Sequence, residues 1–248
     1  MKVSIITAAF NSESTIRDTL QCITEQDYPE IEHIIVDGKS TDNTISVVKA
    51  FPHVAKIISE PDKGIYDAMN KGISIASGEI VGILNSDDIY THSNVISKVA
   101  EIFKDSSVMA LYADLQYVAA NDLNKVLRSW KSGPFKRKNF YYGWMPPHPA
   151  FFVRKEMYNK YGLFNTSLRS AADYELMLRF LVKHEVTPVY LPEVIVKMRN
   201  GGISNANLRN RWRANREDNM AWKFNELKPY FFTVYLKPLR KISQFLVR

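Results

Sequence analysis

The sequence is poor in cysteine and lacks any long hydrophobic run. Its 248 residues include a single cysteine, Cys22, which cannot form an internal disulfide. We expect it to be a small core residue in a reducing compartment. No apolar run approaches the length of a transmembrane helix, and the apolar residues 3–6 are too few for a signal peptide. These absences predict a cytoplasmic protein, including one at the inner face of the cell membrane.

Internal repeats, linkers rich in proline, glycine or serine, and the GxGxxG fingerprint are also missing from the sequence. The last absence argues against a nicotinamide enzyme. We expect one domain, residues 1–204, followed by an extension, residues 205–248. The composition, 46% hydrophobic and 24% charged, is ordinary for a globular protein, and the formal net charge of +7 suits an anionic partner.

The first half of the sequence alternates apolar runs with helical patterns. The expected strands are residues 3–8, 33–36, 56–58 and 80–84. The expected helices are residues 15–26, a helix that begins at residues 42–44, and residues 66–76. Such alternation predicts an α/β fold with a Rossmann-like, mostly parallel sheet flanked by helices.

The second half is less regular. Its expected strands are residues 108–117, 125–129, 151–154, 189–191 and 194–198. Its expected helices are residues 173–183 and the strongly basic residues 205–224. Because ligands of an open sheet bind beyond the carboxyl ends of the strands, the polar residues that end the first-half strands form the candidate site.

Asp87 and Asp88 follow the buried strand 80–84. Two adjacent carboxylates repel each other unless a cation or solvent relieves the repulsion. The hard cations Mg²⁺ and Mn²⁺ favour such oxygen ligands and bridge to substrate phosphates. The pair therefore suggests a metal site, and a solvated turn that caps the next helix is the alternative.

Asp37 ends another strand and is followed by Gly38, which leaves room for a ligand to approach its backbone. An acidic side chain at this position can accept hydrogen bonds from a nucleoside base or ribose. An ordinary Asp/Ser turn is the alternative.

Three segments, in this order, resemble a known family. They are residues 7–11 (TAAFN), 36–42 (VDGKSTD) and 85–88 (NSDD), and their combination is far more specific than any one of them. Over residues 1–200 the chain resembles the family 2 inverting glycosyltransferases with a GT-A fold. The resemblance implies a nucleotide-sugar donor, a UDP-sugar first of all, and a divalent metal, Mn²⁺ or Mg²⁺.

The resemblance also assigns roles. Residues 1–100 would bind the donor and residues 101–204 the acceptor. Asp37 would bind the nucleoside and Asp88 the metal, while Asp87 would touch the ribose or sugar or share the metal. The other donor-binding positions in these segments are Thr7, Phe10, Asn11 and Asn85. Because this chain has Ser-Asp-Asp in place of Asp-x-Asp, which acid touches the ion stays open.

Two cations are further candidates for the donor. Lys63, beside Gly64 at the end of a strand, can pair with the nucleotide. Arg199 adjoins the turn 201–204, which resembles a loop that closes over the donor and grips the diphosphate. A simple exposed turn is the alternative.

An inverting transfer needs a carboxylate that takes the proton of the acceptor hydroxyl, while metal and basic groups stabilise the departing diphosphate. Asp173 resembles the family's base at the start of a helix, although Ala172 stands where the family has glutamate. It would also serve well as a helix cap. Glu175 is the second candidate for the base, and both Glu175 and His148 are candidates for binding the acceptor.

The C-terminal extension is basic and aromatic. Arginine is frequent over residues 208–216, and residues 230–248 interleave aromatic, aliphatic and basic side chains. This mixture suits the interface of an anionic membrane, and a helix packed on the domain is the alternative. No nucleic-acid-binding motif is recognised, so nucleic acid is not an expected partner.

The sequence thus predicts the transfer of a hexose or N-acetylhexosamine to a glycan or lipid-linked acceptor in bacterial surface polysaccharide synthesis. The acceptor follows from the resemblance only. Two other functions stay open. A metal-dependent nucleotidyltransferase would release pyrophosphate instead of a nucleoside diphosphate, and a non-catalytic, membrane-associated adaptor of the same fold would need no base.

Overall fold

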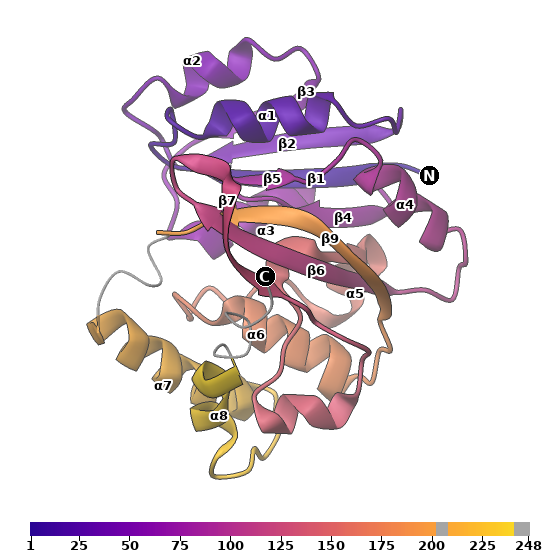
Figure 1. Ribbon diagram of the computed structural model, residues 1–248, viewed down its shortest axis with the longest axis vertical. Coiled ribbons are helices and arrows are strands. Elements are labelled where there is room, and N and C mark those ends of the chain that lie inside the picture. Colours follow the sequence, from indigo (N-terminus) through magenta and orange to yellow (C-terminus); the bar gives the residue numbers. More distant parts are fainter. Residues whose placement is uncertain (202–207, 241–248) are drawn as a thin grey trace.

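The computed structural model describes residues 1–201 and 208–240, and its centre is one nine-stranded sheet flanked by helices (Figure 1). The strand order is β3-β2-β1-β4-β8-β6-β9-β5, with β7 paired to β6. The strands are β1 (Val3–Ala9), β2 (Ile31–Asp37), β3 (Val54–Ser59), β4 (Ile80–Ile83), β5 (Asp88–Tyr90), β6 (Ala110–Ala119), β7 (Asp122–Trp130), β8 (Phe151–Arg154) and β9 (Val189–Arg199). The helices are α1 (Ile16–Thr24), α2 (Thr44–Lys49), α3 (Ile65–Ile75), α4 (Val95–Ile102), η1 (Arg137–Tyr142), η2 (His148–Ala150), α5 (Lys155–Tyr161), α6 (Ala172–Met177), η3 (Leu178–Lys183), α7 (Leu208–Phe224) and α8 (Thr233–Arg240).

The strands β1 to β4 form the parallel sheet that the sequence predicts. β1 pairs in parallel with β2 and β4, and β2 pairs in parallel with β3. Every residue of β1 and β4 is buried, as is usual for parallel strands that are covered on both faces. The carboxyl ends of these strands therefore meet at one edge, where the candidate site was expected.

The second half makes the sheet a mixed one. β8 runs antiparallel to β4 and β6, and β5 runs antiparallel to β9, whereas β6 and β9 are parallel. The prediction of two strands at 189–191 and 194–198 is wrong, because both belong to β9. Pro192 and Glu193 lie at a register shift between β6 and β9, so the strand continues through a bulge that tolerates the missing N–H of proline.

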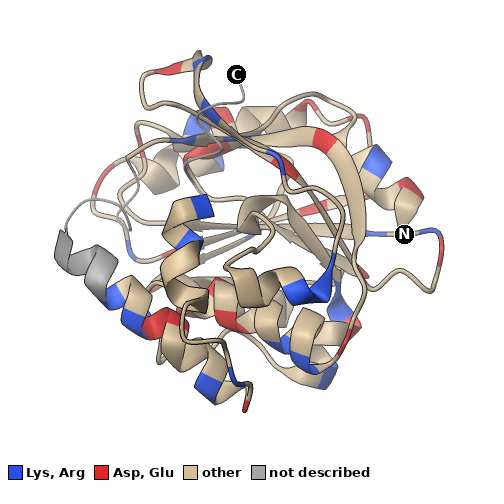
Figure 2. Cartoon of the chain, turned by 60° about the horizontal axis from the view of Figure 1, so that its bottom comes forward, with Lys and Arg blue, Asp and Glu red and all other residues tan. Residues whose placement is uncertain are grey.

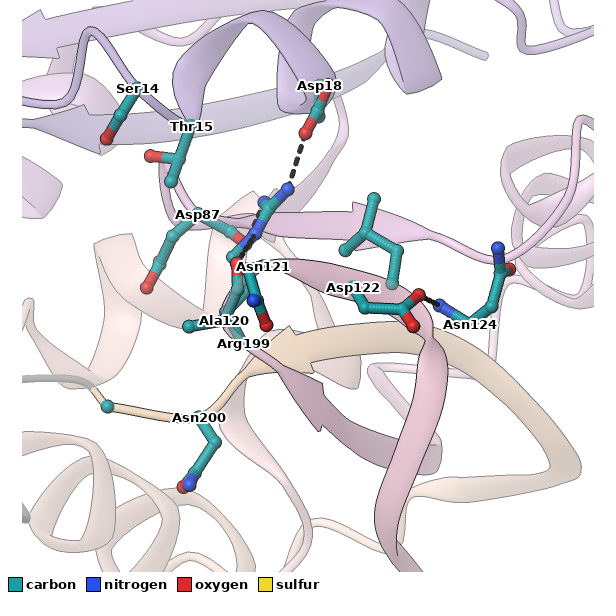
Figure 3. A pocket seen from close by; sticks show the side chains of 12 residues that line it. Ser14, Thr15, Asp18, Asp87, Ala120, Asn121, Asp122, Asn124, Arg199 and Asn200 are labelled. Carbon is teal, nitrogen blue, oxygen red and sulfur yellow. Dashed lines mark hydrogen bonds and ion pairs between the residues drawn. The ribbon is translucent and has the colours of Figure 1, made fainter.

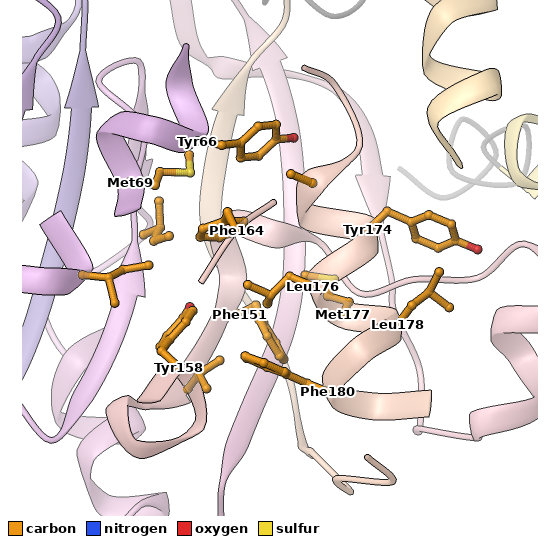
Figure 4. Close-up of a cluster of buried hydrophobic side chains, with 14 of the residues drawn as sticks. Tyr66, Met69, Phe151, Tyr158, Phe164, Tyr174, Leu176, Met177, Leu178 and Phe180 are labelled. Atoms are coloured by element: carbon orange, nitrogen blue, oxygen red, sulfur yellow. The ribbon is translucent and has the colours of Figure 1, made fainter. Parts of the chain in front are cut away.

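Helices cover both faces of the sheet. On one face, α1 and α4 bury apolar side chains against β1 and β6. On the other, α3 and α6 close a larger cluster that contains Tyr66, Phe151 and Tyr174 (Figure 4). Gly72 lets α3 approach β1, because a Cβ there would lie 2.4 Å from Cγ2 of Ile6. α3 is thus held close to the sheet, and the expected helix 173–183 is α6 continued by the π-helical turn η3.

Cys22 of α1 is a core residue. Its sulfur accepts a hydrogen bond from the backbone N–H of Tyr90 at 3.3 Å. Burial raises the pKa of the Cys22 thiol to about 12. The thiol therefore stays protonated and unreactive at neutral pH.

The described part of the C-terminal extension packs on the domain. Trp222 of α7 is fully buried, and its Nε1 donates a hydrogen bond to the hydroxyl of Tyr174 at 3.0 Å. The Asn225 side chain donates to the backbone carbonyl of Glu175 at 3.1 Å. Glu217 accepts hydrogen bonds from the backbone N–H groups of residues 169 and 170. α7 therefore matches the packed-helix alternative.

Residues 202–207, which contain the expected boundary at 204 and most of the predicted donor loop, and residues 241–248 lie outside the described residues. Among the residues that the structure describes, no helix has the length and apolar character needed to cross a membrane.

Replacing Trp222 by alanine tests whether α7 is part of the core. We expect Trp222→Ala to lower the free energy of unfolding by about 3–5 kcal/mol, because it opens a large cavity next to Tyr174. Phe224→Ala in the same helix is the matched control, since Phe224 is 45% exposed and should cost far less. Urea denaturation of both variants measures the difference, and equal losses would show that α7 does not pack as described.

Candidate active site

Hydrogen bonds tie the polar strand ends of the parallel half together. Asn11, which follows β1, accepts a hydrogen bond from the backbone N–H of Thr41 at 2.9 Å. Ser12 shares a 2.9 Å hydrogen bond with Ser86 of the NSDD segment. Asn11 has φ 48, a left-handed conformation that asparagine tolerates better than most residues. The segments 7–11 and 36–42 are therefore in contact, and Ser12, the residue that follows the first of them, contacts the NSDD segment.

Asp37 is fully buried at the end of β2. Its Oδ2 accepts hydrogen bonds from Ser40 N at 3.0 Å and from the hydroxyl of Ser59 at 2.6 Å, and its Oδ1 accepts one from the Ser40 hydroxyl. The Asp/Ser turn that the sequence offered as the alternative is therefore formed. Nucleoside binding by Asp37 stays a prediction.

An exposed part of this edge lies beside Gly38. A Cβ on Gly38 would meet Asp62 Oδ2 at 2.9 Å and the ring of Phe10 at 3.3 Å. Phe10 is 62% exposed, and the neighbouring Lys63 side chain is also exposed. The predicted donor residues Phe10 and Lys63 are thus accessible to a nucleotide, and Asp62 joins them although the sequence did not single out its side chain.

Thr7 lies inside the sheet and not at its edge. It is fully buried, and its hydroxyl is hydrogen-bonded to Nε2 of His33 at 3.0 Å. The other nitrogen of His33 lies 3.0 Å from Nε2 of His53. Burial lowers the pKa of His33 to about 3. This polar chain occupies the Thr7 hydroxyl, so the structure offers no support for direct donor binding by Thr7.

Asp87 and Asp88 differ in their surroundings. Asp88 is fully buried, and its Oδ2 accepts a hydrogen bond from Asn85 Nδ2 at 2.9 Å. Burial and the neighbouring Asp87 charge raise the pKa of Asp88 well above its usual value, and burial raises that of Asp87. Among the described residues, Asp88 Oδ1 and Asn85 Oδ1 are buried oxygens without a hydrogen-bond partner.

A pocket of about 820 Å³ opens beside Asp87 (Figure 3). The start of α1 lines one side, the turn between β6 and β7 another, and Arg199 lies between them. The turn contributes Ala120 and Asn121 to the lining, and the start of β7 contributes Asp122, Leu123 and Asn124. These residues were not predicted from the sequence, because a hairpin turn carries no motif of its own.

Arg199 is buried, and its guanidinium forms hydrogen bonds and an ion pair with other groups of the protein. Its Nε donates to the carbonyl of Ala120 at 3.1 Å, its Nη1 donates to the carbonyl of Asp87 at 2.9 Å, and its Nη2 pairs with Asp18. Arg199 therefore fixes the backbone that carries the two acids. Direct contact with the diphosphate stays a prediction.

Asp173 lies in the first turn of α6, where the predicted base was placed. Its Oδ1 accepts a hydrogen bond from the hydroxyl of Tyr66 at 3.1 Å. Tyr66 stacks on Phe164 with 5.5 Å between ring centroids, and His148 packs edge-on against Phe164 at 5.6 Å. The side chain of Asn70 exchanges two hydrogen bonds with the backbone of Phe164, which fixes that ring between the other two.

Burial lowers the pKa of His148, whereas the nearby charge of Asp173 raises it. His148 and Asp173, two of the residues predicted for the acceptor side, are thus neighbours. Tyr66 was not singled out from the sequence.

Glu175 is directed into the core. It is 3% exposed, and its carboxylate pairs with the guanidinium of Arg179 at 2.7 and 3.1 Å and accepts a hydrogen bond from Asn225 at 3.1 Å. These partners give it a structural role between α6 and α7. The geometry therefore favours Asp173 over Glu175 as the base, and acceptor binding by Glu175 stays a prediction.

Tyr117 of β6 links the two groups of acids. Burial raises its pKa, the adjacent Arg128 lowers it, and the charges of both Asp88 and Asp173 raise it. The Arg128 guanidinium lies 3.6 Å from the centroid of the Tyr117 ring. The charges of both carboxylates therefore act on the Tyr117 hydroxyl. No motif marks Tyr117 or Arg128 in the sequence.

The fold and the order of its polar strand ends can be compared with those of known proteins. The model of the family described as glycosyl transferase family 2 matches residues 4–162. The chain belongs to glycosyl transferase family 2. An uncharacterized glycosyltransferase of Mycobacterium tuberculosis is 31% identical over 204 residues, which cover 81% of this chain and 76% of that protein. A PGL/p-HBAD biosynthesis glycosyltransferase of Mycobacterium bovis is 27% identical over 215 residues, 82% of this chain and 78% of that protein.

Solved structures share the GT-A fold of this glycosyltransferase. Residues 1–349 of Staphylococcus aureus TarS, in complex with UDP-GlcNAc, match 98% of this chain and 73% of that one, with a TM-score of 0.71 and 19% identity. This chain spans 43% of the longer TarS structure. The mannosyltransferase PcManGT of Pyrobaculum calidifontis, in complex with GDP-Man and Mn²⁺, matches 98% of this chain and 73% of that one, with a TM-score of 0.65 and 19% identity.

The buried His33 makes the stability of the enzyme depend on pH. Its pKa is about 3 in the folded chain against 6.5 for a free side chain, so the unfolded chain binds the proton first as pH falls. We expect His33 alone to lower the free energy of unfolding by about 2 kcal/mol between pH 7 and pH 5. Urea denaturation at both pH values measures the loss. In His33→Gln the decrease in the free energy of unfolding between pH 7 and pH 5 should be smaller by about 2 kcal/mol. A decrease equal to that of the wild type would show that His33 does not cause it.

Proposed function

We propose that this glycosyltransferase transfers a hexose or N-acetylhexosamine, with inversion, from a UDP-sugar to a glycan or lipid-linked acceptor. The observation that carries the proposal is the 3.1 Å hydrogen bond from Tyr66 of α3 to Asp173 of α6, which joins the candidate base to the half of the chain that holds the NSDD segment. An inverting transfer needs a donor-binding acid and a base in one site. The complex of TarS with UDP-GlcNAc supports a UDP-sugar. The relatives named for PGL/p-HBAD biosynthesis support a lipid-linked acceptor. Because such an acceptor would be met at the inner face of the cell membrane, that is the location we propose.

The NSDD segment fits a divalent cation. Asp88 Oδ1 and Asn85 Oδ1 are buried acceptors without a donor, and Asp87 faces the pocket. Oxygen donors of this kind suit Mn²⁺ or Mg²⁺, and PcManGT was solved with Mn²⁺. Within residues 1–201 and 208–240, no three His, Cys, Asp or Glu side chains cluster as metal ligands, so donor phosphates would complete the coordination. The bound ion would supply positive charge to the departing diphosphate.

We assign Asp173 as the base that takes the proton of the acceptor hydroxyl. Tyr66 engages its Oδ1 at 3.1 Å, which orients the carboxylate and leaves Oδ2 to accept the proton. As that proton moves to Asp173, the hydroxyl oxygen attacks the anomeric carbon and the bond to the diphosphate breaks on the opposite face of the sugar. Arg199 takes part indirectly, because it holds the Asp87 carbonyl and hence the NSDD backbone.

Asp173→Asn tests the base. We expect transfer to fall by about 10²–10⁴-fold, because the amide cannot take the proton, while UDP-sugar binding is retained. The assay measures release of UDP from a panel of UDP-sugars with a bacterial lipid extract as the acceptor source and Mn²⁺ present. Glu175→Gln is the matched control on the same helix, and it should retain transfer while lowering the melting temperature.

Three results would contradict this assignment. If Asp173→Asn turned over at the wild-type rate, Asp173 would not be the base. If Glu175→Gln lost transfer activity without a lower melting temperature, the base would be Glu175. Release of pyrophosphate from a nucleotide substrate would instead indicate a nucleotidyltransferase. An adaptor would show no product at all.

Asp88→Asn tests the cation site. Because a neutral amide attracts Mn²⁺ less than a carboxylate does, we expect the affinity for UDP in the presence of Mn²⁺ to fall at least tenfold, about 1.4 kcal/mol. Isothermal titration calorimetry with and without Mn²⁺ gives the affinities. Asp122→Asn, in the same pocket, is the control and should keep the Mn²⁺ dependence. Unchanged affinity in Asp88→Asn would exclude Asp88 as a ligand of the ion.

A further inference from the structure

An unusually exposed aromatic surface lies at the C-terminal end of the molecule. We call it the α8 surface and define it by Tyr142, Tyr230, Phe231, Tyr235 and Leu239. Phe231 is 90% exposed, Tyr235 66% and Leu239 56%. Large apolar side chains grouped in this way are uncommon on a protein that meets only water.

Three aromatic rings of this surface contact the ring of Phe232, which adjoins it. The ring of Phe232 lies 5.2 Å from that of Phe231, 5.3 Å from that of Tyr230 and 5.9 Å from that of Tyr142, measured between centroids. A hollow of about 460 Å³ adjoins them and is lined by Tyr142, Leu236, Leu239 and Arg240. The surface is therefore one continuous patch, built from η1, α8 and the residues before α8.

Positive charge surrounds the patch. Residues 131–142 contain four Lys or Arg and no acid, and residues 223–240 contain four Lys or Arg and a single acid, Glu226. Glu226 pairs with Lys183, Arg137 with Glu185 and Lys237 with Asp218, and the other Lys and Arg residues of these two segments carry the surplus positive charge. Figure 2 brings this end of the molecule forward and shows Lys and Arg on its helices. The partner that covers the patch must therefore accept aromatic side chains and carry negative charge.

The patch is fixed to the domain. The Thr233 hydroxyl donates to the carbonyl of Tyr141 at 2.6 Å, and Gly143, with φ 77, lies so close to α8 that a Cβ would be 2.5 Å from Lys237 N. The Lys237 ammonium lies 3.7 Å from the centroid of the Tyr174 ring. Tyr174 follows the proposed base Asp173, so the α8 surface has a set position relative to the site.

We propose that the α8 surface docks the enzyme on an anionic membrane. Tyrosine and phenylalanine side chains lie favourably at the level of the lipid headgroups, and surrounding cations add attraction to anionic lipids. The described helices are too short and too charged to cross the bilayer, so the contact is peripheral. Docking here holds the acceptor side of the active site close to the bilayer, where a lipid-linked acceptor would be found. The docking itself does not depend on the proposed transfer reaction.

Vesicle binding of the full chain tests the aromatic part of the surface. We expect sedimentation with vesicles of phosphatidylcholine mixed with phosphatidylglycerol, and much less with phosphatidylcholine alone. In the double variant Phe231→Ser with Tyr235→Ser, partitioning should fall by about tenfold or more, because two inserted rings are lost. Ile57→Ser is the matched control, since Ile57 is an exposed apolar residue of β3 at the far end of the molecule.

Charge-reversal variants test the contribution of the cations separately. Lys138→Glu with Lys228→Glu should weaken binding to the phosphatidylglycerol vesicles, and raised salt should do the same to the wild type. Lys49→Glu on α2 is the control and should bind as the wild type does. Circular dichroism of all variants reports whether each is folded, and the exposed positions chosen should leave the melting temperature unchanged.

Absence of wild-type binding to the anionic vesicles would overturn the proposal, as would equal binding by Phe231→Ser with Tyr235→Ser. Sedimentation velocity without lipid measures whether a second copy of the chain binds to the α8 surface. A dimer that dissociates in the double variant, together with no vesicle binding, would assign the α8 surface to a second copy of the chain. A monomer that does not bind vesicles would likewise overturn the proposal.

Discussion

Two adjacent carboxylates in a place from which water is largely excluded are the constraint on which this site depends. Burial raises the pKa values of Asp87 and Asp88, and the charge of Asp87 raises that of Asp88 further. The surrounding protein fixes the backbone of the two acids. Arg199 donates a hydrogen bond to the Asp87 carbonyl, and the Thr19 hydroxyl donates one to the Asp88 carbonyl at 2.8 Å. The backbone is thus fixed, while carboxylate oxygens stay open to a cation that arrives with the donor.

The mixed sheet explains how the second half of the chain reaches these acids. β8 pairs with β4 at the edge of the parallel half, and the chain then continues into the helices that carry Asp173. Tyr66 of α3, from the first half, meets Asp173 of α6, from the second. The two halves of the chain are therefore joined by a direct hydrogen bond, and the orientation of Asp173, the proposed base, depends on the packing of α3 on β1.

The sequence was sufficient for the parts of the fold that depend on local pattern. The buried strands β1, β2 and β4 and the helices α1 and α3 show clear apolar periods, and the polar residues at the strand ends do meet at one edge. Contacts between residues far apart in the chain could not be predicted in this way. Thr7 binds His33 inside the sheet and Glu175 binds Arg179 in the core, and neither partner can be inferred from spacing along the chain. Pro192 suggested a break, yet pairing with β6 carries β9 past it.

The burial of Cys22 has a practical consequence. Its thiol is held in the core with a pKa of about 12, and the sequence contains no other cysteine, so maleimide reagents should leave the native chain unlabelled. A cysteine introduced at any exposed position would then be the only group to react. A fluorophore or spin label could be attached there without first removing native thiols, which makes the depth and movement of individual surface positions accessible to spectroscopy.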